Sequence, residues 1–392
     1  MEHTKLGHIA KIQTGPFGSQ LHQSDYQPTG IPCIMPCNIG SNLNIICDNI
    51  AYISEEDLNR LAKHKTQEGD IVYSRRGDIE KCAYISSQES GWLCGTGCLK
   101  VSIDSTLALP KYIAYLLSTP DSKAWLVGNA VGTTMLNLNT AVLSDFPISL
   151  PDIETQRKAV DIIDAIVDKI ELNKRINDNL EQQAQAAFNN IIANTTSDKT
   201  VQLAEIAWLN PKRSISKGTI ARSIEMAHLP TTGSFPSGWE MKEYNGGMKF
   251  QNGDTLMARI TPCLENGKVA FVNFLEDDEI AFGSTEYITM TPKRQFAPEV
   301  LYFLVRNAEF IDFAVKNMNG SSGRQRVSAD TIGTYELPDI TLEELHMLET
   351  IAREALTKIK YNSLENMRLA EMRDTLLPKL MSGELKINEI DC

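Results

Sequence analysis

Two long stretches of the chain share one pattern of apolar and polar positions. In the first stretch, apolar residues recur at alternating steps of three and four, a spacing typical of a coiled-coil helix. The positions are Ala159, Ile163, Ile166, Ile170, Leu180, Ala184, Ala187 and Ile191, with Asn173 and Asn177 in the middle of the series. The second stretch repeats this spacing at Leu348, Ala352, Ala355, Ile359 and Leu369, with Asn362 and Asn366 at the matching places. The pattern therefore predicts one long helix that occurs twice.

The asparagines indicate how the two helices pack. An amide in an apolar seam costs stability unless its hydrogen bonds are satisfied, and asparagines that face each other across a coiled coil fix its register. We therefore expect an antiparallel coiled coil in which Asn173 and Asn177 meet Asn362 and Asn366. The competing interpretation places these asparagines on the solvated face of independently packed helices. At a rise of about 1.5 Å per residue, a helix of about 40 residues is about 60 Å long, which suits a spacer.

The segments that precede the helices repeat as well. Residues 69–75 (GDIVYSR) match residues 253–259 (GDTLMAR), and each is predicted to form a turn followed by a buried strand. Pro110 and Pro298 open matching helices, and the sequence Leu-Pro-Asp-Ile precedes both long helices. The expected fold class is α+β, with two mixed α/β domains that are each followed by a long helix. The predicted boundaries are 1–150 and 198–337 for the domains, 151–197 and 338–385 for the helices, and 386–392 for a tail.

Length, composition and charge narrow the class of protein. The chain has 392 residues, of which 42% are hydrophobic, so it is long enough for two or three domains with proper cores. Its formal net charge is −12, and more than half of the acidic excess lies in residues 151–200 and 338–392. This distribution argues against a free-standing protein that binds nucleic acid regardless of sequence. The absence of a long apolar run and of a signal peptide leads us to expect a cytoplasmic protein without membrane contact.

The sequence contains no motif that indicates catalysis. It lacks a phosphate-binding Gly-x-x-x-x-Gly-Lys-Ser/Thr loop, a Gly-x-Gly-x-x-Gly turn and the Asn/Asp-Pro-Pro-aromatic tetrad of adenine methyltransferases. Cys33, Cys37, Cys94 and Cys98 suggest a zinc site, but their spacing departs from the usual two-residue gap, and reduced thiols are the preferred interpretation. We expect no catalytic residue, no metal and no cofactor bound by this chain.

Polar and basic residues in the loops are the candidates for DNA binding. Arginine and glutamine can read base edges, and lysine mainly holds phosphate. The loop at residues 320–326 (GSSGRQR) is the best single candidate because flanking glycines allow close approach to DNA. The candidates are Lys11, Gln13, Thr14, Ser19, Gln20, Arg76, Lys81, Lys212, Arg213, Lys217, Ser321, Ser322, Arg324, Gln325 and Arg326. For each basic cluster the competing interpretation is a solvated or salt-bridged surface.

In this combination of features the chain resembles the specificity subunits of type I restriction-modification systems, the HsdS family. The resemblance is carried by the repeated domain-plus-helix order, the Leu-Pro-Asp-Ile-Glu-Thr-Gln run that ends at Gln156, and the loop at residues 14–21 (TGPFGSQL). It covers essentially the whole chain. The second copy departs from the pattern, because residues 338–344 (PDITLEE) lack the glutamine.

The resemblance implies a division of labour. Each globular domain would be a target recognition domain that reads one half of a bipartite site in double-stranded DNA, and the paired helices would set the gap between the halves. Two methyltransferase subunits, which use S-adenosylmethionine, would dock on this scaffold, and restriction subunits would add ATP- and Mg²⁺-dependent cleavage. The alternatives are a self-contained DNA-modifying or DNA-cleaving enzyme with its own recognition domains, and a coiled-coil scaffold that does not bind DNA.

Overall fold

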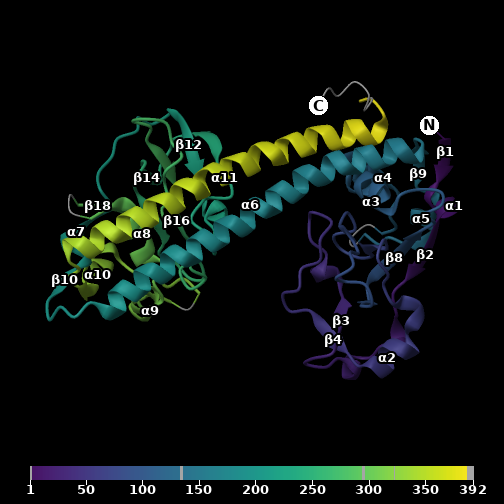
Figure 1. The fold of residues 1–392 in the computed structure, drawn as a ribbon, viewed down its shortest axis with the longest axis horizontal. Helices are drawn as coiled ribbons and strands as arrows, with labels where there is room; N and C mark the ends of the chain where they lie inside the picture. The colour runs from purple at the N-terminus through teal and green to yellow at the C-terminus, as the bar shows by residue number, and fades with distance from the viewer. Residues whose placement is uncertain (1, 133–135, 294–295, 322, 386–392) are drawn as a thin grey trace. The chain divides into compact units, whose positions relative to one another are not determined.

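The computed structural model describes residues 2–132, 136–293, 296–321 and 323–385, so the predicted tail lies outside the described residues. The chain forms two compact units (Figure 1). Unit 1 contains residues 1–168 and 369–392, and unit 2 contains residues 169–368. The boundary between the units therefore falls inside both long helices. Each unit thus combines one of the predicted domains with parts of both predicted helices.

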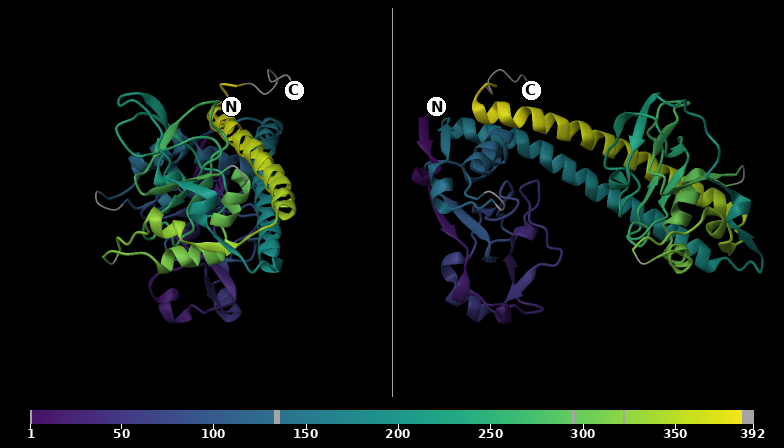
Figure 2. Two further views of the ribbon diagram at one scale, coloured as in Figure 1. Left: turned by 90° about the vertical axis from the view of Figure 1, so that its left-hand side faces the viewer. Right: turned by 180° about the vertical axis from the view of Figure 1, so that it is seen from behind.

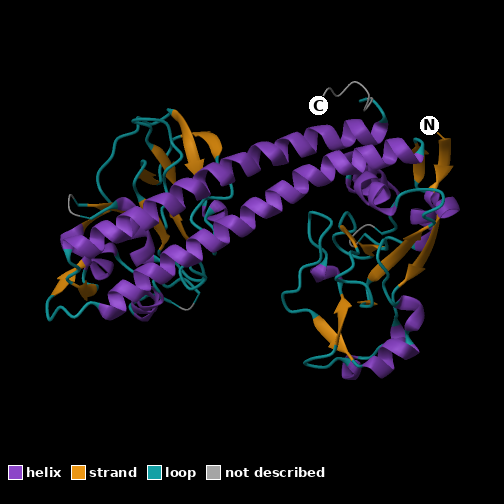
Figure 3. Ribbon diagram, viewed as in Figure 1, coloured by secondary structure: helices purple, strands orange, loops and turns teal. Residues whose placement is uncertain are grey.

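Unit 1 combines short strands with helices (Figure 3). In chain order its elements before the long helix are β1 (Glu2–Lys5), α1 (Leu6–Ile9), β2 (Ala10–Thr14), β3 (Ile31–Ile34), β4 (Ala51–Ile53), α2 (Glu55–Arg60), β5 (Ile71–Ser74), β6 (Cys82–Tyr84), β7 (Leu93–Cys94), β8 (Cys98–Ile103), α3 (Pro110–Ser118), α4 (Pro120–Asn129), α5 (Thr140–Asp145) and β9 (Pro147–Leu150).

Unit 2 repeats this order of elements, except that a strand, β14, stands where unit 1 has the helix α2. They are β10 (Thr200–Gln202), α7 (Leu203–Ile206), β11 (Ala207–Leu209), β12 (Ile220–Ile224), β13 (Glu240–Glu243), β14 (Met248–Phe250), β15 (Thr255–Ala258), β16 (Val269–Phe271), β17 (Ala281–Gly283), β18 (Tyr287–Pro292), α8 (Pro298–Val305), α9 (Ala308–Lys316), α10 (Ala329–Gly333) and β19 (Glu336–Pro338).

The repeat extends to the pairing of strands. A four-stranded antiparallel sheet has the order β2-β8-β5-β6 in unit 1 and β11-β18-β15-β16 in unit 2. In each unit a second sheet contains one parallel pair, β3 with β7 and β12 with β17. The first and last strands of each domain also pair, β1 with β9 and β10 with β19. Unit 2 adds β14 at the edge of its second sheet.

The long helices are α6 (Ile153–Asn194) and α11 (Leu342–Ser382). Asp152 caps the start of α6 by accepting a hydrogen bond from the backbone N–H of Thr155 at 2.9 Å. At the start of α11, the side chains of Thr341 and Glu344 accept from each other's backbone N–H groups, which is a capping box. Gly383 follows α11 with φ +74, a left-handed conformation that glycine adopts readily after a helix.

Each half of a long helix packs on a globular domain as well as on the other helix. In unit 1, Ala159 and Ile163 of α6 share a core with Leu380 of α11 and with the helices and sheet of the domain. In unit 2, Phe188 of α6 and Leu348 of α11 share a core with α8, α9 and the four-stranded sheet. In each unit the seam positions are thus buried by the other long helix, by the helices of the domain and by its sheet. This shared burial explains why each compact unit includes part of both long helices.

Gln156 ties the first domain to the start of α6. Its side chain is buried, its Nε2 donates to the carbonyl of Pro151 at 2.9 Å, and its Oε1 accepts from the backbone N–H of Leu109 at 2.8 Å. Leu109 is the residue that precedes α3, so one amide joins two helix starts. Gln156, the last residue of the Leu-Pro-Asp-Ile-Glu-Thr-Gln run, therefore has a structural role.

Candidate nucleic-acid interface

The topology of unit 1 brings three loops to one end of the four-stranded sheet. β2 and β5 both run antiparallel to the central strand β8, so the ends of β2 and β5 lie beside the beginning of β8. The turn before β8 makes contact on both sides. The carbonyl of Gly95 lies against Gly15 after β2, and the carbonyl of Gly97 accepts from the backbone N–H of Arg75 at 2.8 Å after β5. The loop at residues 15–20 and the hairpin at residues 75–81 therefore flank a common turn.

Most of the candidate residues of unit 1 lie at this end of the sheet. Ser19 and Arg76 are exposed, whereas Gln20 and Lys81 are partly exposed. The Nζ of Lys81 pairs with Asp78 at 2.8 Å within the same hairpin. Lys11 is exposed earlier on β2, opposite Ser102, and thus lies apart from the loops.

Gln13 and Thr14 contact a buried histidine. The Nε2 of Gln13 lies 3.4 Å from the Nδ1 of His64, and the backbone of Thr14 also bonds to the imidazole. Burial, assisted by the nearby charges of Lys63 and Lys100, lowers the pKa of His64 to about 4. The imidazole is therefore neutral at pH 7, and Gln13 is held by a neutral group.

The corresponding end of the sheet in unit 2 carries the glycine-flanked loop. Asn319 and Arg326 exchange two backbone hydrogen bonds of 2.9 Å, which close the loop between them. Arg259, which follows β15, accepts from the backbone N–H of Val327 at 3.0 Å and so holds the loop at the sheet end. In unit 1, Val131 and Asn137 exchange the corresponding pair of backbone hydrogen bonds.

The residues of this loop differ in their solvent exposure and in whether they form ion pairs. Ser321 and Arg324 are exposed and Gln325 is partly exposed, whereas Ser322 lies outside the described residues. Arg326 forms a forked pair with Glu286, with contacts of 2.7 to 3.0 Å. The hydrogen bonds from Arg326 lower the pKa of the Glu286 carboxyl. Arg326 therefore serves the loop's own structure, whereas the side chain of Arg324 makes no ion pair with any of the residues that the structure describes.

Arg213, which the sequence analysis includes among the DNA-binding candidates, is instead buried in an ion pair. Its guanidinium donates to Asp254 Oδ1 at 2.8 Å and to Thr291 Oγ1 at 3.0 Å, and the two charged side chains are only 7% and 0% exposed. Burial raises the pKa of Asp254, and the bonds from Thr291 and Arg213 oppose that rise. Unit 1 builds the same site with Asp70, which accepts from Ser102 at 2.5 Å and pairs with Lys100 at 3.6 Å. Arg213 is thus a structural counterion, whereas Lys212 and Lys217 of the same loop are exposed.

The four seam asparagines contact one another within unit 2, where α6 and α11 run side by side (Figures 1 and 2). Asn173 donates to Asn366 at 2.9 Å and to Glu365 at 2.7 Å. Asn362 donates to Asn177 at 2.8 Å. Residue numbers rise along one helix as they fall along the other, so the helices are antiparallel, and each amide finds its partner across the seam.

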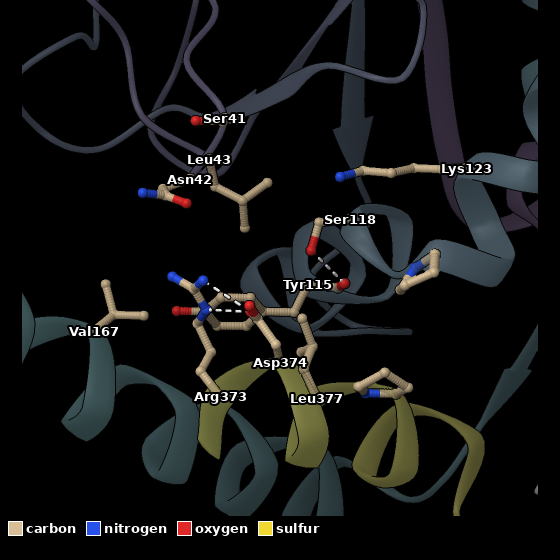
Figure 4. A pocket seen from close by; sticks show the side chains of 12 residues that line it. Ser41, Asn42, Leu43, Tyr115, Ser118, Lys123, Val167, Arg373, Asp374 and Leu377 are labelled. Atoms are coloured by element: carbon tan, nitrogen blue, oxygen red, sulfur yellow. Dashed lines mark hydrogen bonds and ion pairs between the residues drawn. The ribbon is translucent and has the colours of Figure 1, made fainter. Parts of the chain in front are cut away.

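Unit 1 also contains a cavity of about 390 Å³ next to the long helices (Figure 4). Its lining comes from the loop at residues 41–43, from α3 and α4, and from α6 and α11. Lys123 and Arg373 are its cations, and Arg373 is paired with Asp374 at 2.8 Å. Within the described part of the chain, its lining includes none of the residues predicted to bind DNA. The sequence patterns gave no signal for this cavity, because its wall is assembled from five separate segments.

Two exposed aromatic residues were missed by the sequence analysis. Phe17 is 57% exposed in the first loop of unit 1, and Trp208 is 59% exposed on β11 of unit 2. Trp208 occupies the position that Lys11 has in the first copy, and the Nζ of Lys293 lies 4.4 Å from the centre of its ring. Comparing the two copies position by position would have singled out Trp208. Its counterpart in the first copy is Lys11, and a position occupied by lysine is expected at the surface.

The cysteines do not form an evident metal site in the described residues, where no group of three or more His, Cys, Asp or Glu side chains could hold a metal ion. Cys33, Cys94 and Cys98 are buried, and burial raises the pKa of Cys33 and of Cys94 to about 12. Among the helices that the structure describes, none is both long and apolar enough to cross a membrane.

Comparison with known proteins agrees with this architecture. Residues 1–182 match the family described as type I restriction modification DNA specificity domain. The chain is 22% identical to the type I restriction enzyme HindI specificity subunit of Haemophilus influenzae over 90% of this chain and 95% of that protein. It is 23% identical to the MjaIX specificity subunit of Methanocaldococcus jannaschii over 93% of this chain and 89% of that protein.

A solved structure supports the fold. The crystal structure of the type I restriction-modification system S subunit from M. genitalium aligns with a TM-score of 0.62 at 14% identity, and it covers 97% of this chain and 96% of that one. The chain is therefore similar to type I restriction-modification specificity subunits along nearly its whole length, and it shares the fold of one of them.

Proposed function

We propose that this chain is the DNA sequence-specificity subunit of a type I restriction-modification complex. The observation that carries the proposal is the repeated end of the sheet. Both units have the same strand order and loops at the same sheet end, yet the side chains in those loops differ. A repeated scaffold with divergent loops suits a protein that reads two different half-sites of double-stranded DNA.

The proposed partners rest on the similarity of the chain to type I specificity subunits. Two methyltransferase subunits dock on the scaffold of α6 and α11, and restriction subunits join them. S-adenosylmethionine, ATP and Mg²⁺ are bound by those partner subunits, and the complex acts in the cytoplasm. The specificity subunit itself catalyses nothing. Purified chain alone, given S-adenosylmethionine, ATP and Mg²⁺, should neither methylate nor cleave DNA, whereas the complex with its partners should.

The long helices act as the ruler between the half-sites in this proposal. Each helix contributes to both units, and α6 with 42 residues is about 63 Å long at about 1.5 Å per residue. Inserting one heptad at mid-helix into both α6 and α11 should lengthen the gap between half-sites and leave their sequences unchanged. An unchanged gap in a folded complex would contradict the ruler.

Methylome sequencing tests the proposal directly. A host that expresses this chain with its methyltransferase subunit should carry adenine methylation at one bipartite site. Exchanging residues 198–337 for the same segment of a relative should change one half of that site and preserve the other half. A chimera that is folded and active but changes both halves would contradict the assignment of one half-site to each domain.

A further inference from the structure

Phe17 is the exposed aromatic residue of the first loop, and its backbone is fixed on both sides. Gly15 lies so close to the turn before β8 that a Cβ there would be 2.1 Å from the carbonyl oxygen of Gly95. On the other side, the carbonyl of Phe17 accepts from the backbone N–H of Gln20 at 3.2 Å, and the Oε1 of Gln20 accepts from the N–H of Phe17 at 3.4 Å. The ring therefore projects from a tight turn and not from a loose segment.

A cation locks the far side of the same loop. The guanidinium of Arg60 donates to the carbonyl of Gln20 at 2.6 Å, and it is held by Asp57 at 2.6 Å and Asp25 at 3.3 Å. Leu21 then enters a small hydrophobic core of unit 1. An exposed ring on a backbone anchored in this way has little conformational freedom to lose when it binds a partner.

The loop stands beside the most exposed arginine of the same sheet end. The ends of β2 and β5 are two strand spacings apart across β8, which is about 10 Å. Gly18 beside Phe17 and Gly77 beside Arg76 both have positive φ, and a Cβ at either would meet no atom within 4 Å. The backbone at both loop tips is thus open to a partner. At a rise of about 3.4 Å per base pair, a spacing of about 10 Å corresponds to about three base pairs.

On these observations, and resting on the proposed function, we infer that Phe17 is a wedge that inserts at one base step of the half-site read by unit 1. Apolar side chains that enter a base step unstack it and bend the duplex, and a rigid aromatic ring suits this role. Arg76 then holds the DNA about three base pairs away. The corresponding loop of unit 2, residues 210–218, contains no aromatic residue, so the wedge is assigned to the half-site read by unit 1.

The test uses the full chain in complex with its methyltransferase subunits and duplexes that contain 2-aminopurine at one position at a time. The wild-type complex should raise 2-aminopurine fluorescence at one step of the half-site assigned to unit 1. Phe17→Ala should abolish that rise and weaken DNA binding on the order of 10-fold or more, whereas Phe17→Trp should retain both. Leu107→Ala is the matched control, because Leu107 is 49% exposed beyond the opposite end of β8 and should change neither.

The other outcomes separate the two hypotheses. If the wild-type complex binds its site and Phe17→Ala changes neither fluorescence nor affinity, the wedge is wrong and the proposed function stands. If Phe17→Ala instead fails to retain the methyltransferase subunits during gel filtration, Phe17 contacts a protein partner and the wedge is again wrong. If the wild-type complex shows no site-specific binding, the proposed function itself fails.

Discussion

The asparagine pairs between α6 and α11 give the sharpest test of the helix packing. Asn173 and Asn366 are joined by a 2.9 Å hydrogen bond, and Asn173 is only 1% exposed. Replacing Asn173 by leucine takes the donor away from Asn366, and replacing Asn366 leaves Asn173 with Glu365 as its remaining acceptor; an amide left short of a partner costs about 1 to 3 kcal/mol. Replacing both removes that cost and places two leucines in the seam. We therefore expect a favourable coupling of about 1 to 2 kcal/mol in the double-mutant cycle Asn173→Leu, Asn366→Leu.

Native-state hydrogen exchange is the suitable assay, because a chain with two compact units need not unfold in one step. The opening free energies of the α6 amides between residues 170 and 180 should report the coupling. Gln182→Leu, an exposed position on the same helix, is the control and should change stability by less than about 0.5 kcal/mol. A coupling below about 0.3 kcal/mol would show that Asn173 and Asn366 do not pair.

Three further results are expected. Arg213→Ala should lower the stability of unit 2 by about 3 to 5 kcal/mol, since it leaves the Asp254 carboxylate buried without its counterion; a thermal melt that stays unchanged while DNA binding is lost would contradict this. Arg324→Ala should weaken DNA binding by the complex and reduce the salt dependence of binding without changing the melting temperature. Arg326→Ala should lower the melting temperature, because it removes the pair with Glu286. Equal effects of the two variants would contradict the assignment of Arg324 to DNA binding and of Arg326 to loop structure. Because the pKa of His64 is lowered to about 4 in the fold, its contribution to stability is present above its ordinary pKa near 6.5 and is lost as the pH falls toward 4. Thermal melts of His64→Gln should lose that part of the pH dependence, and a variant as pH-sensitive as the wild type would argue against it.

The repeat was accessible from the sequence because it is a matter of local pattern. Alternating steps of three and four define an apolar helix face wherever they occur, and the asparagines stood out because they interrupt that face. The fold class and the antiparallel pairing of α6 and α11 were predicted correctly from these signals, and the strand order then proved to repeat as well. The bounds of α11 depend on local capping by Thr341 and Gly383, which acts within one turn.

Tertiary structure alone decided which polar residues are free. Arg213 and Lys212 are neighbours in one loop, yet Arg213 forms a buried ion pair with Asp254, a residue far away in the sequence. Arg326 is paired with Glu286 in the same way, whereas Arg324, two positions earlier, is exposed. Whether a charged side chain faces solvent or a counterion depends on which strands the topology makes adjacent. The residue type by itself does not predict this. The same holds for Phe17, because only the packing of Gly15 against Gly95 shows that an exposed ring is held on a fixed backbone.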